Sequence, residues 1–124
     1  MNSIGLLKQD FRHWAQVEQL SADSGMLSLF FKNKAFRSVA YYRMRRSGLV
    51  LRIVQRILRI LLPEQECLYI KTSQIGGGLY IQHGFATIIT AESIGKNVWI
   101  NQQVTIGYNG DKAPIIGDNV VIYA

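Results

Sequence analysis

The hydrophobic positions of the chain follow two different periods, a helical one in the first half and a six-residue one in the second. In residues 4–20, apolar side chains recur every three or four residues, which places them on one face of a helix. These side chains are Ile4, Leu7, Phe11 and Trp14. Asn2 or Ser3 can cap this helix, because either side chain can accept a hydrogen bond from the first turn.

Polar residues at 21–25 interrupt the helical spacing, and residues 28–46 resume it. A cluster of Ser, Asp and Gly between two periodic segments is typical of a loop. The sequence therefore predicts a second helix over residues 28–46, with Gly48 as its stop signal.

Residues 49–62 predict a third helix, which is strongly amphipathic. Its polar side chains are spaced by 0, 3, 4 and 7 residues, so they form one stripe along the helix. The stripe consists of Arg52, Gln55, Arg56 and Arg59, and every other residue of the run is Leu, Ile or Val. Pro63 ends the helix, since proline disfavours helical geometry in the residue before it.

After Pro63 the spacing changes to six residues. Seven isoleucines mark the register: Ile75, Ile81, Ile94, Ile100, Ile106, Ile116 and Ile122. The gaps between them are 6, 13, 6, 6, 10 and 6, and Gly follows Ile at 76, 95, 107 and 117. This is a hexapeptide repeat with a single-residue slip near Thr87 and one loop at 108–114.

Each hexapeptide predicts a short strand and a turn, with one aliphatic side chain pointing inward. Three such units close a triangular coil, and successive coils stack through parallel backbone hydrogen bonds. The predicted fold class is therefore mixed. A short α-helical lead-in over residues 1–63 is followed by a parallel β-helix of hexapeptide repeats over residues 64–124.

Composition and charge refine this division. Hydrophobic residues make up 48% of the 124 positions and charged residues 18%, which excludes a disordered chain, and a single Cys excludes an internal disulfide. The formal charge of +6 is uneven, because residues 1–62 hold 11 basic and 3 acidic side chains whereas residues 63–124 hold 3 and 5. The basic character therefore belongs to the helical lead-in.

The N-terminus lacks the uninterrupted apolar stretch of a signal peptide, and no window approaches the roughly 18 uncharged apolar residues of a spanning helix. A single Cys is also compatible with a reducing compartment. We therefore expect a cytoplasmic protein, either free or at the inner face of the membrane.

The stripe of residues 52–59 has more than one interpretation. The favoured one is a solvated face, with the broad apolar face of the helix packed on the coil or on other subunits. The alternative is peripheral contact with an anionic membrane surface through the Arg-rich helix. Nucleic acid is not an expected partner, because the aromatic residues are not interleaved with the charges as a stacking platform requires.

Three segments resemble the hexapeptide-repeat acyltransferases: IGGGLYIQHG at 75–84, SIGKNVWINQQVTIG at 93–107 and IIGDNVVI at 115–122. Within that family the chain looks most like the serine acetyltransferase branch, including its relatives in capsular and exopolysaccharide gene clusters. The resemblance covers roughly residues 64–124. In addition, FRSVAYYR at 36–43 resembles the helical lead-in of the polysaccharide-type members.

The resemblance implies a left-handed parallel β-helix that assembles as a homotrimer. It also implies acetyl-CoA as co-substrate in the cleft between neighbouring subunits, with no metal and no tightly bound cofactor. The histidine of the I-x-H motif, which would activate the acceptor hydroxyl, maps onto His83. Acetyl transfer to an alcohol needs a general base and donors for the developing oxyanion. An imidazole suits the role of base, because its ordinary pKa lies near neutrality.

Three polar residues near the expected cleft are candidates for binding the acceptor: Gln82, Asn101 and Gln103. The alternative interpretation is that they are solvated positions on the outside of the coil. Gly107 allows close backbone approach to CoA. Tyr108, in a loop that would reach a neighbouring subunit, and Ala124 are further candidates for contact with acetyl-CoA. Glu92 is the nearest acidic residue that could orient His83, although a solvated corner residue is the favoured interpretation.

The chain also departs from the serine acetyltransferase pattern. Those enzymes usually carry an acidic residue where Gln82 stands, another near positions 68–69, and a second histidine where Ala113 stands. These differences favour a saccharide hydroxyl, of the capsule or exopolysaccharide type, with serine O-acetyltransferase as the alternative enzyme. A truncated, non-catalytic assembly piece is the third hypothesis. Without the loop at 108–114, residues 75–124 hold under two and a half coils of about 18 residues each, and the repeat stops at Ala124.

Overall fold

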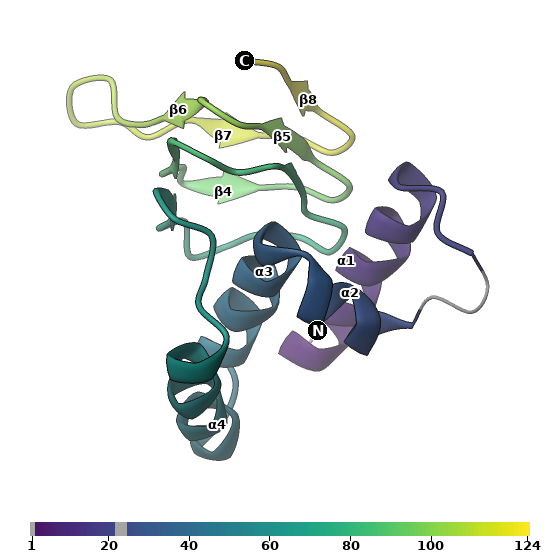
Figure 1. Ribbon diagram of the computed structural model, residues 1–124. Coiled ribbons are helices and arrows are strands. Elements are labelled where there is room, and N and C mark those ends of the chain that lie inside the picture. Colours follow the sequence, from purple (N-terminus) through teal and green to yellow (C-terminus); the bar gives the residue numbers. More distant parts are fainter. Residues whose placement is uncertain (1, 22–24) are drawn as a thin grey trace.

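The computed structural model describes residues 2–21 and 25–124, which form four helices followed by short parallel strands (Figure 1). The helices are α1 (Ser3–Val17), α2 (Met26–Lys32), α3 (Lys34–Arg45) and α4 (Leu49–Leu61). The predicted cap of the first helix is confirmed, because Asn2 Oδ1 accepts a hydrogen bond of 2.7 Å from the backbone N–H of Gly5. Residues 22–24 of the predicted loop lie outside the described part of the chain.

The prediction of one helix over residues 28–46 is wrong, because Asn33 divides it into α2 and α3. Asn33 adopts an extended backbone, with φ −118° and ψ 112°, and its side chain accepts a hydrogen bond of 3.0 Å from the N–H of Phe36. It therefore acts as the N-cap of α3. Gly48 is also misassigned, since α3 ends at Arg45 and Gly48 is the residue that precedes α4.

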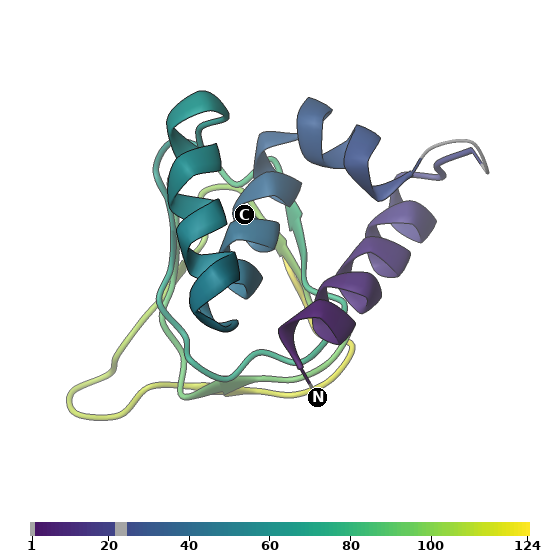
Figure 2. The same cartoon turned by 90° about the horizontal axis from the view of Figure 1, so that it is seen from below.

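The second half of the chain forms a coil with three parallel sheets, in the strand orders β1-β3-β6, β2-β5-β8 and β4-β7. Seen along its axis, the coil is triangular (Figure 2). The strands are β1 (Leu68–Ile70), β2 (Tyr80–Gln82), β3 (Thr87–Ile89), β4 (Ser93–Ile94), β5 (Trp99–Asn101), β6 (Thr105–Ile106), β7 (Ile115–Ile116) and β8 (Val121–Ile122). The stacking of hexapeptide units that the sequence predicts is confirmed by these parallel pairs.

The isoleucines of the repeat point into the coil. The first five of them are buried, and the last two pack against the same core: Ile75, Ile81, Ile94, Ile100, Ile106, Ile116 and Ile122. Aromatic side chains of the helices belong to this core as well, with the ring centroids of Trp14 and Tyr80 4.5 Å apart. The helices and the coil therefore share one hydrophobic core.

Two of the glycines that follow isoleucine sit where coils stack most closely. A Cβ on Gly76 would lie 2.7 Å from the carbonyl oxygen of Gly95 in the next coil. A Cβ on Gly95 would lie 2.7 Å from the backbone nitrogen of Asp118, in the coil that follows. Because real Cβ atoms do not approach this closely, glycine is required at both positions by packing.

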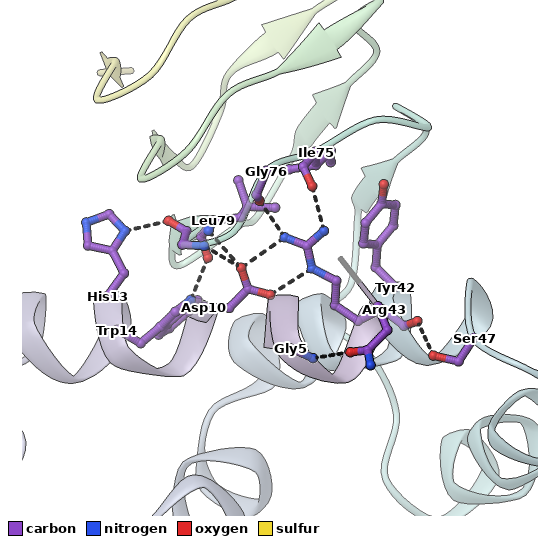
Figure 3. Close-up of polar contacts among 12 residues, drawn as sticks. Gly5, Asp10, His13, Trp14, Tyr42, Arg43, Ser47, Ile75, Gly76 and Leu79 are labelled. Carbon is purple, nitrogen blue, oxygen red and sulfur yellow. Dashed lines mark hydrogen bonds and ion pairs between the residues drawn. The ribbon is translucent and has the colours of Figure 1, made fainter. Parts of the chain in front are cut away.

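A buried ion pair fastens α1 and α3 to the first coil (Figure 3). Arg43 Nε and Nη2 donate to the two oxygens of Asp10 at 2.8 and 3.0 Å, and the side chains are only 3% and 0% exposed. Arg43 also donates to the carbonyl oxygens of Ile75 and Gly76 at 2.8 and 2.7 Å. Asp10 Oδ1 accepts from the N–H groups of Gly78 and Leu79, both at 2.9 Å. Each nitrogen of the Arg43 guanidinium and each oxygen of the Asp10 carboxylate therefore has at least one hydrogen-bond partner.

The apolar face of α4 is expected from the sequence to pack on the coil or on other subunits, and within this chain it does not pack on the coil. The helix rests on α3, and the side turned toward α3 carries Gln55, which is 2% exposed although it belongs to the predicted polar stripe. Seven apolar side chains are instead 37–82% exposed: Leu49, Val50, Ile53, Val54, Ile57, Ile60 and Leu61. Within residues 2–21 and 25–124, no helix is long and apolar enough to cross a membrane.

Candidate functional site

His83 lies at the corner of the coil where β2 ends. Its backbone is in the left-handed region, with φ +65°, and Gly84 follows with φ +77°. This sharp bend leaves the imidazole exposed, in the outward position at a turn that the sequence predicts. Within the described residues His83 forms no hydrogen bond, so both of its ring nitrogens are open to a ligand.

A cleft of about 740 Å³ lies beside His83, between the helices and the coil. The coil contributes Tyr80, Gln82, His83 and Trp99. The helices contribute charged side chains of both signs: Glu18, Lys32 and Lys34. The cleft therefore joins a free imidazole to groups that can bind a cation and an anion.

Gln82 and Asn101 lie next to each other, because they are paired residues of β2 and β5. Asn101 Oδ1 accepts a hydrogen bond of 2.7 Å from Trp99 Nε1, which orients the amide and leaves its NH₂ group free to donate. Gln103 follows β5 at the corner that His83 occupies one coil earlier, and it too has a positive φ of 58°. The structure thus brings three predicted polar positions to the corner of His83.

The acidic residue of the cleft is Glu18, the C-cap of α1, and no sequence motif points to it. Tyr80 donates a hydrogen bond of 2.7 Å to Glu18 Oε1. Burial raises the pKa of the Tyr80 hydroxyl, and its hydrogen bond to Glu18 raises it further. Glu92, the acidic candidate named from the sequence, is exposed and does not line the cleft. Glu18 carries no motif of its own, since it lies 65 residues before His83 and reaches the cleft only when α1 docks.

Lys34, on the opposite wall, is engaged in an exposed ion pair. Its Nζ lies 2.7 Å from Glu66 Oε1, and this hydrogen bond from Lys34 lowers the pKa of the Glu66 carboxyl. Lys32 is exposed at the end of α2 and makes no hydrogen bond or ion pair within the residues that the structure describes. Lys32 is therefore the more available cation of the wall.

The residues predicted to contact acetyl-CoA do not gather in this cleft. Gly107 and Tyr108 follow β6, one corner further along the coil than His83, and both are exposed. They begin the loop 108–114, which projects from the coil and is closed by a bridge between Asn109 and Lys112 (Figure 2). Ala124 is exposed after β8, at the top of the column of β2 and β5.

The chemistry of the cleft is that of proton transfer and hydrogen bonding. Among the described residues, no group of three His, Cys, Asp or Glu side chains is close enough to hold a metal ion. The imidazole of His83 can accept a proton from a hydroxyl, and the amides of Gln82 and Asn101 can donate to an oxygen.

Comparisons with known proteins find the fold among solved structures. No family model and no curated protein sequence matches the chain. Serine acetyltransferase isoform 3 of Entamoeba histolytica, solved in complex with cysteine, is similar with a TM-score of 0.61 and 24% identity, over 94% of this chain and 44% of that one. Serine acetyltransferase 1 of the same organism, solved with L-cysteine, is similar with a TM-score of 0.57 and 20% identity, over 94% and 48%.

These likenesses show the fold: helices followed by parallel strands, arranged as in the solved serine acetyltransferases. The chain spans less than half the length of either solved protein.

Proposed function

We propose that the chain is an acetyl-CoA-dependent O-acetyltransferase in which His83 is the general base. The carrying observation is the exposed imidazole of His83 on the wall of a cleft that Gln82 also lines, with Asn101 as the strand partner of Gln82. The similarity of the fold to solved serine acetyltransferases supports the reaction type.

The proposed step is a direct transfer. The acceptor hydroxyl gives its proton to His83 as its oxygen attacks the thioester carbonyl carbon, and a tetrahedral oxyanion forms. The carbon–sulfur bond then breaks, the acetyl group stays on the acceptor oxygen, and the proton passes from His83 to the departing CoA thiolate. The NH₂ groups of Gln82 and Asn101 can hydrogen-bond the acceptor or the oxyanion, and such donors typically contribute about 10²–10³ in rate.

Serine is the acceptor that the comparisons favour, because both solved proteins are serine acetyltransferases that bind an amino acid. The cleft suits a zwitterion of that kind. Glu18 can pair with an ammonium group, and Lys32 can pair with a carboxylate. We therefore place serine O-acetyltransfer first.

A saccharide hydroxyl is the second candidate acceptor. It is favoured by Gln82, which puts a neutral amide directly beside His83, and by Ala113, which puts a methyl group in the loop. A site lined by uncharged hydrogen-bonding groups suits a sugar, whose hydroxyls are neutral, better than it suits a charged amino acid.

The proposal includes an assembly. The coil is left-handed, three copies form a homotrimer in the cytoplasm, and acetyl-CoA lies between neighbouring subunits as a co-substrate and not as a tightly bound cofactor. Gly107, Tyr108 and Ala124 lie outside the cleft of their own chain, so they would contact acetyl-CoA bound against a neighbouring copy. Gln103 would bind the acceptor from the corner above His83.

The decisive test is the His83→Ala variant of the full chain. Its acetyl transfer is measured by the release of free CoA thiol. A lost general base lowers the rate by about 10²–10⁴, and the subunit number should stay unchanged. His13→Gln is the matched histidine control, because His13 lies on α1, outside the cleft, and its side chain is hydrogen-bonded to the Gly78 carbonyl.

Serine and a panel of sugars serve as separate acceptor arms of the same assay. Turnover with serine alone supports the first candidate, and turnover with a sugar alone supports the second. Unchanged turnover of the His83→Ala protein would show that His83 is not the base. Absence of CoA release with every acceptor would favour the non-catalytic assembly piece.

A further inference from the structure

α4 presents a broad apolar surface to solvent. We call it the α4 outer face, and it consists of Leu49, Val50, Ile53, Val54, Ile57, Ile60 and Leu61. Residues spaced by three, four or seven positions share one side of a helix, so these side chains form a continuous strip. The strip is turned away from Gln55, which faces α3. Contiguous apolar surfaces of this kind mark interaction sites on soluble proteins.

Cations border the strip on one side. Arg52, Arg56 and Arg59 are all exposed, and α4 has no acidic residue. Only Arg59 has an acidic neighbour among the described residues, at 3.6 Å between its Nε and Glu64 Oε1. The surface thus combines apolar contact area with an uncompensated positive edge.

An anionic lipid surface matches both properties of this face. Apolar side chains enter the boundary between headgroups and acyl chains, while arginines beside them reach the phosphates. A second copy that packs α4 against α4 would bring like charges together, with no acidic side chain on either helix to pair with them. The helical half of the chain carries 11 basic and 3 acidic residues, against 3 and 5 in the other half. This difference in charge also turns the helical half toward an anionic surface.

The shape of the molecule leaves α4 free for such contact. The helix projects from the end of the molecule opposite β8, and the coil stands on the far side of α3 (Figure 1). With 13 residues, α4 is about 20 Å long, which suits a helix that lies in the plane of the interface.

We propose that the α4 outer face docks on an anionic lipid bilayer, with α4 parallel to the surface and the coil directed away from it. This docking is independent of the proposed acetyl transfer, so either can fail without the other.

Flotation of the full chain with lipid vesicles tests the charge requirement. The protein should float with vesicles of phosphatidylcholine containing one third phosphatidylglycerol, and far less with phosphatidylcholine alone. Arg52→Gln/Arg56→Gln should lower partitioning about 30-fold, because each cation near an anionic surface contributes about 1 kcal/mol. Lys96→Gln/Lys112→Gln is the matched control, since it removes the same charge from exposed positions of the coil. Failure of the unaltered chain to float with the anionic vesicles would refute the docking.

A second pair of variants tests the apolar requirement. Ile57→Glu/Ile60→Glu should abolish flotation, whereas Ile115→Glu/Tyr123→Glu, which alters equally exposed apolar residues of the coil, should not. Circular dichroism verifies that each variant is folded. Sedimentation velocity without lipid measures the subunit number of the same variants. If Ile57→Glu/Ile60→Glu lowers the subunit number, the α4 outer face is a contact between copies and the lipid proposal is wrong.

Discussion

α3 and α4 are adjacent helices of 12 and 13 residues that place the same kind of side chain in opposite surroundings. α3 buries two arginines, Arg37 and Arg43, in the interior of the molecule. α4 exposes its three arginines and, beside them, most of its leucine, isoleucine and valine side chains. Charge is thus inside on one helix, and apolar surface is outside on the next.

The difference follows from the partners that each helix meets. Arg37 donates to the carbonyl oxygens of Phe30, Phe31 and Pro63 at 2.7–3.0 Å, and Arg43 meets Asp10 and two carbonyls of the coil. A buried cation is tolerated when each of its nitrogens donates a hydrogen bond, as the three guanidinium nitrogens of both residues do. α4 makes its main contacts with α3, and the apolar side chains of its outer face stay 37–82% exposed within the described chain.

The largest expected effect comes from removing the buried cation of α3. Arg43→Met leaves the Asp10 carboxylate buried without its partner, and breaking a pair of this kind costs about 3–5 kcal/mol of the free energy of unfolding. Arg52→Met on α4, an exposed arginine, should change it by less than about 0.5 kcal/mol. Urea denaturation of the two variants measures the difference. Equal losses would mean that α3 and α4 do not differ as described.

A smaller loss is expected where the coil stacks on itself. Gly76→Ala places a Cβ 2.7 Å from the Gly95 carbonyl oxygen, and such overpacking typically costs about 1–3 kcal/mol. Gly117→Ala is the control, because the same Ile-Gly position there has no atom within 4 Å of the new Cβ. Urea midpoints compare the two. A Gly76→Ala protein as stable as Gly117→Ala would show that the coils can separate without cost.

Gln55 of α4 is a buried polar residue that, unlike the arginines of α3, lacks a hydrogen bond for one of its atoms within the described chain. Its Nε2 is buried and has no hydrogen-bond partner among the described residues. An unsatisfied buried donor costs about 1–3 kcal/mol, so Gln55→Leu should raise the free energy of unfolding by about 1 kcal/mol. Thermal denaturation detects the change, with Gln16→Leu at an exposed position of α1 as the control. Destabilisation by Gln55→Leu would mean that the amide has a role in the α3–α4 contact.

The smallest effect concerns the contact of α1 with the coil at alkaline pH. The pKa of Tyr80 is raised above its ordinary value of 10.0 in the folded protein, so the folded state holds its proton more tightly than the unfolded state. The free energy of unfolding should therefore fall as the pH rises above about 10. Tyr80→Phe should reduce that slope without removing it, because burial also raises the pKa of Tyr41 and Tyr42. An unchanged slope in urea titrations between pH 9 and 11 would contradict the assignment.

Part of the candidate site could be read from the sequence. The register of isoleucines places position 83 just after an inward Ile81 and hence at a corner, and the pairing of Gln82 with Asn101 follows from one coil of the repeat. The other wall of the cleft could not be predicted. Glu18 and Lys32 belong to helices whose docking on the coil depends on contacts such as Asp10 with Arg43, between residues 33 positions apart.

The sequence alone determined the features that repeat. Helical spacing, the six-residue period, Pro63 and the loop at 108–114 all appear as local patterns, because each strand and turn is decided within a few residues. Only the tertiary structure decided which side of each helix is covered. Asp10 and Arg43 are buried because they find each other and the coil, Gln55 is buried because it faces α3, and the apolar side of α4 stays exposed because no described segment reaches it. Amphipathic spacing shows that a helix has two faces, and the choice between them depends on distant segments of the chain.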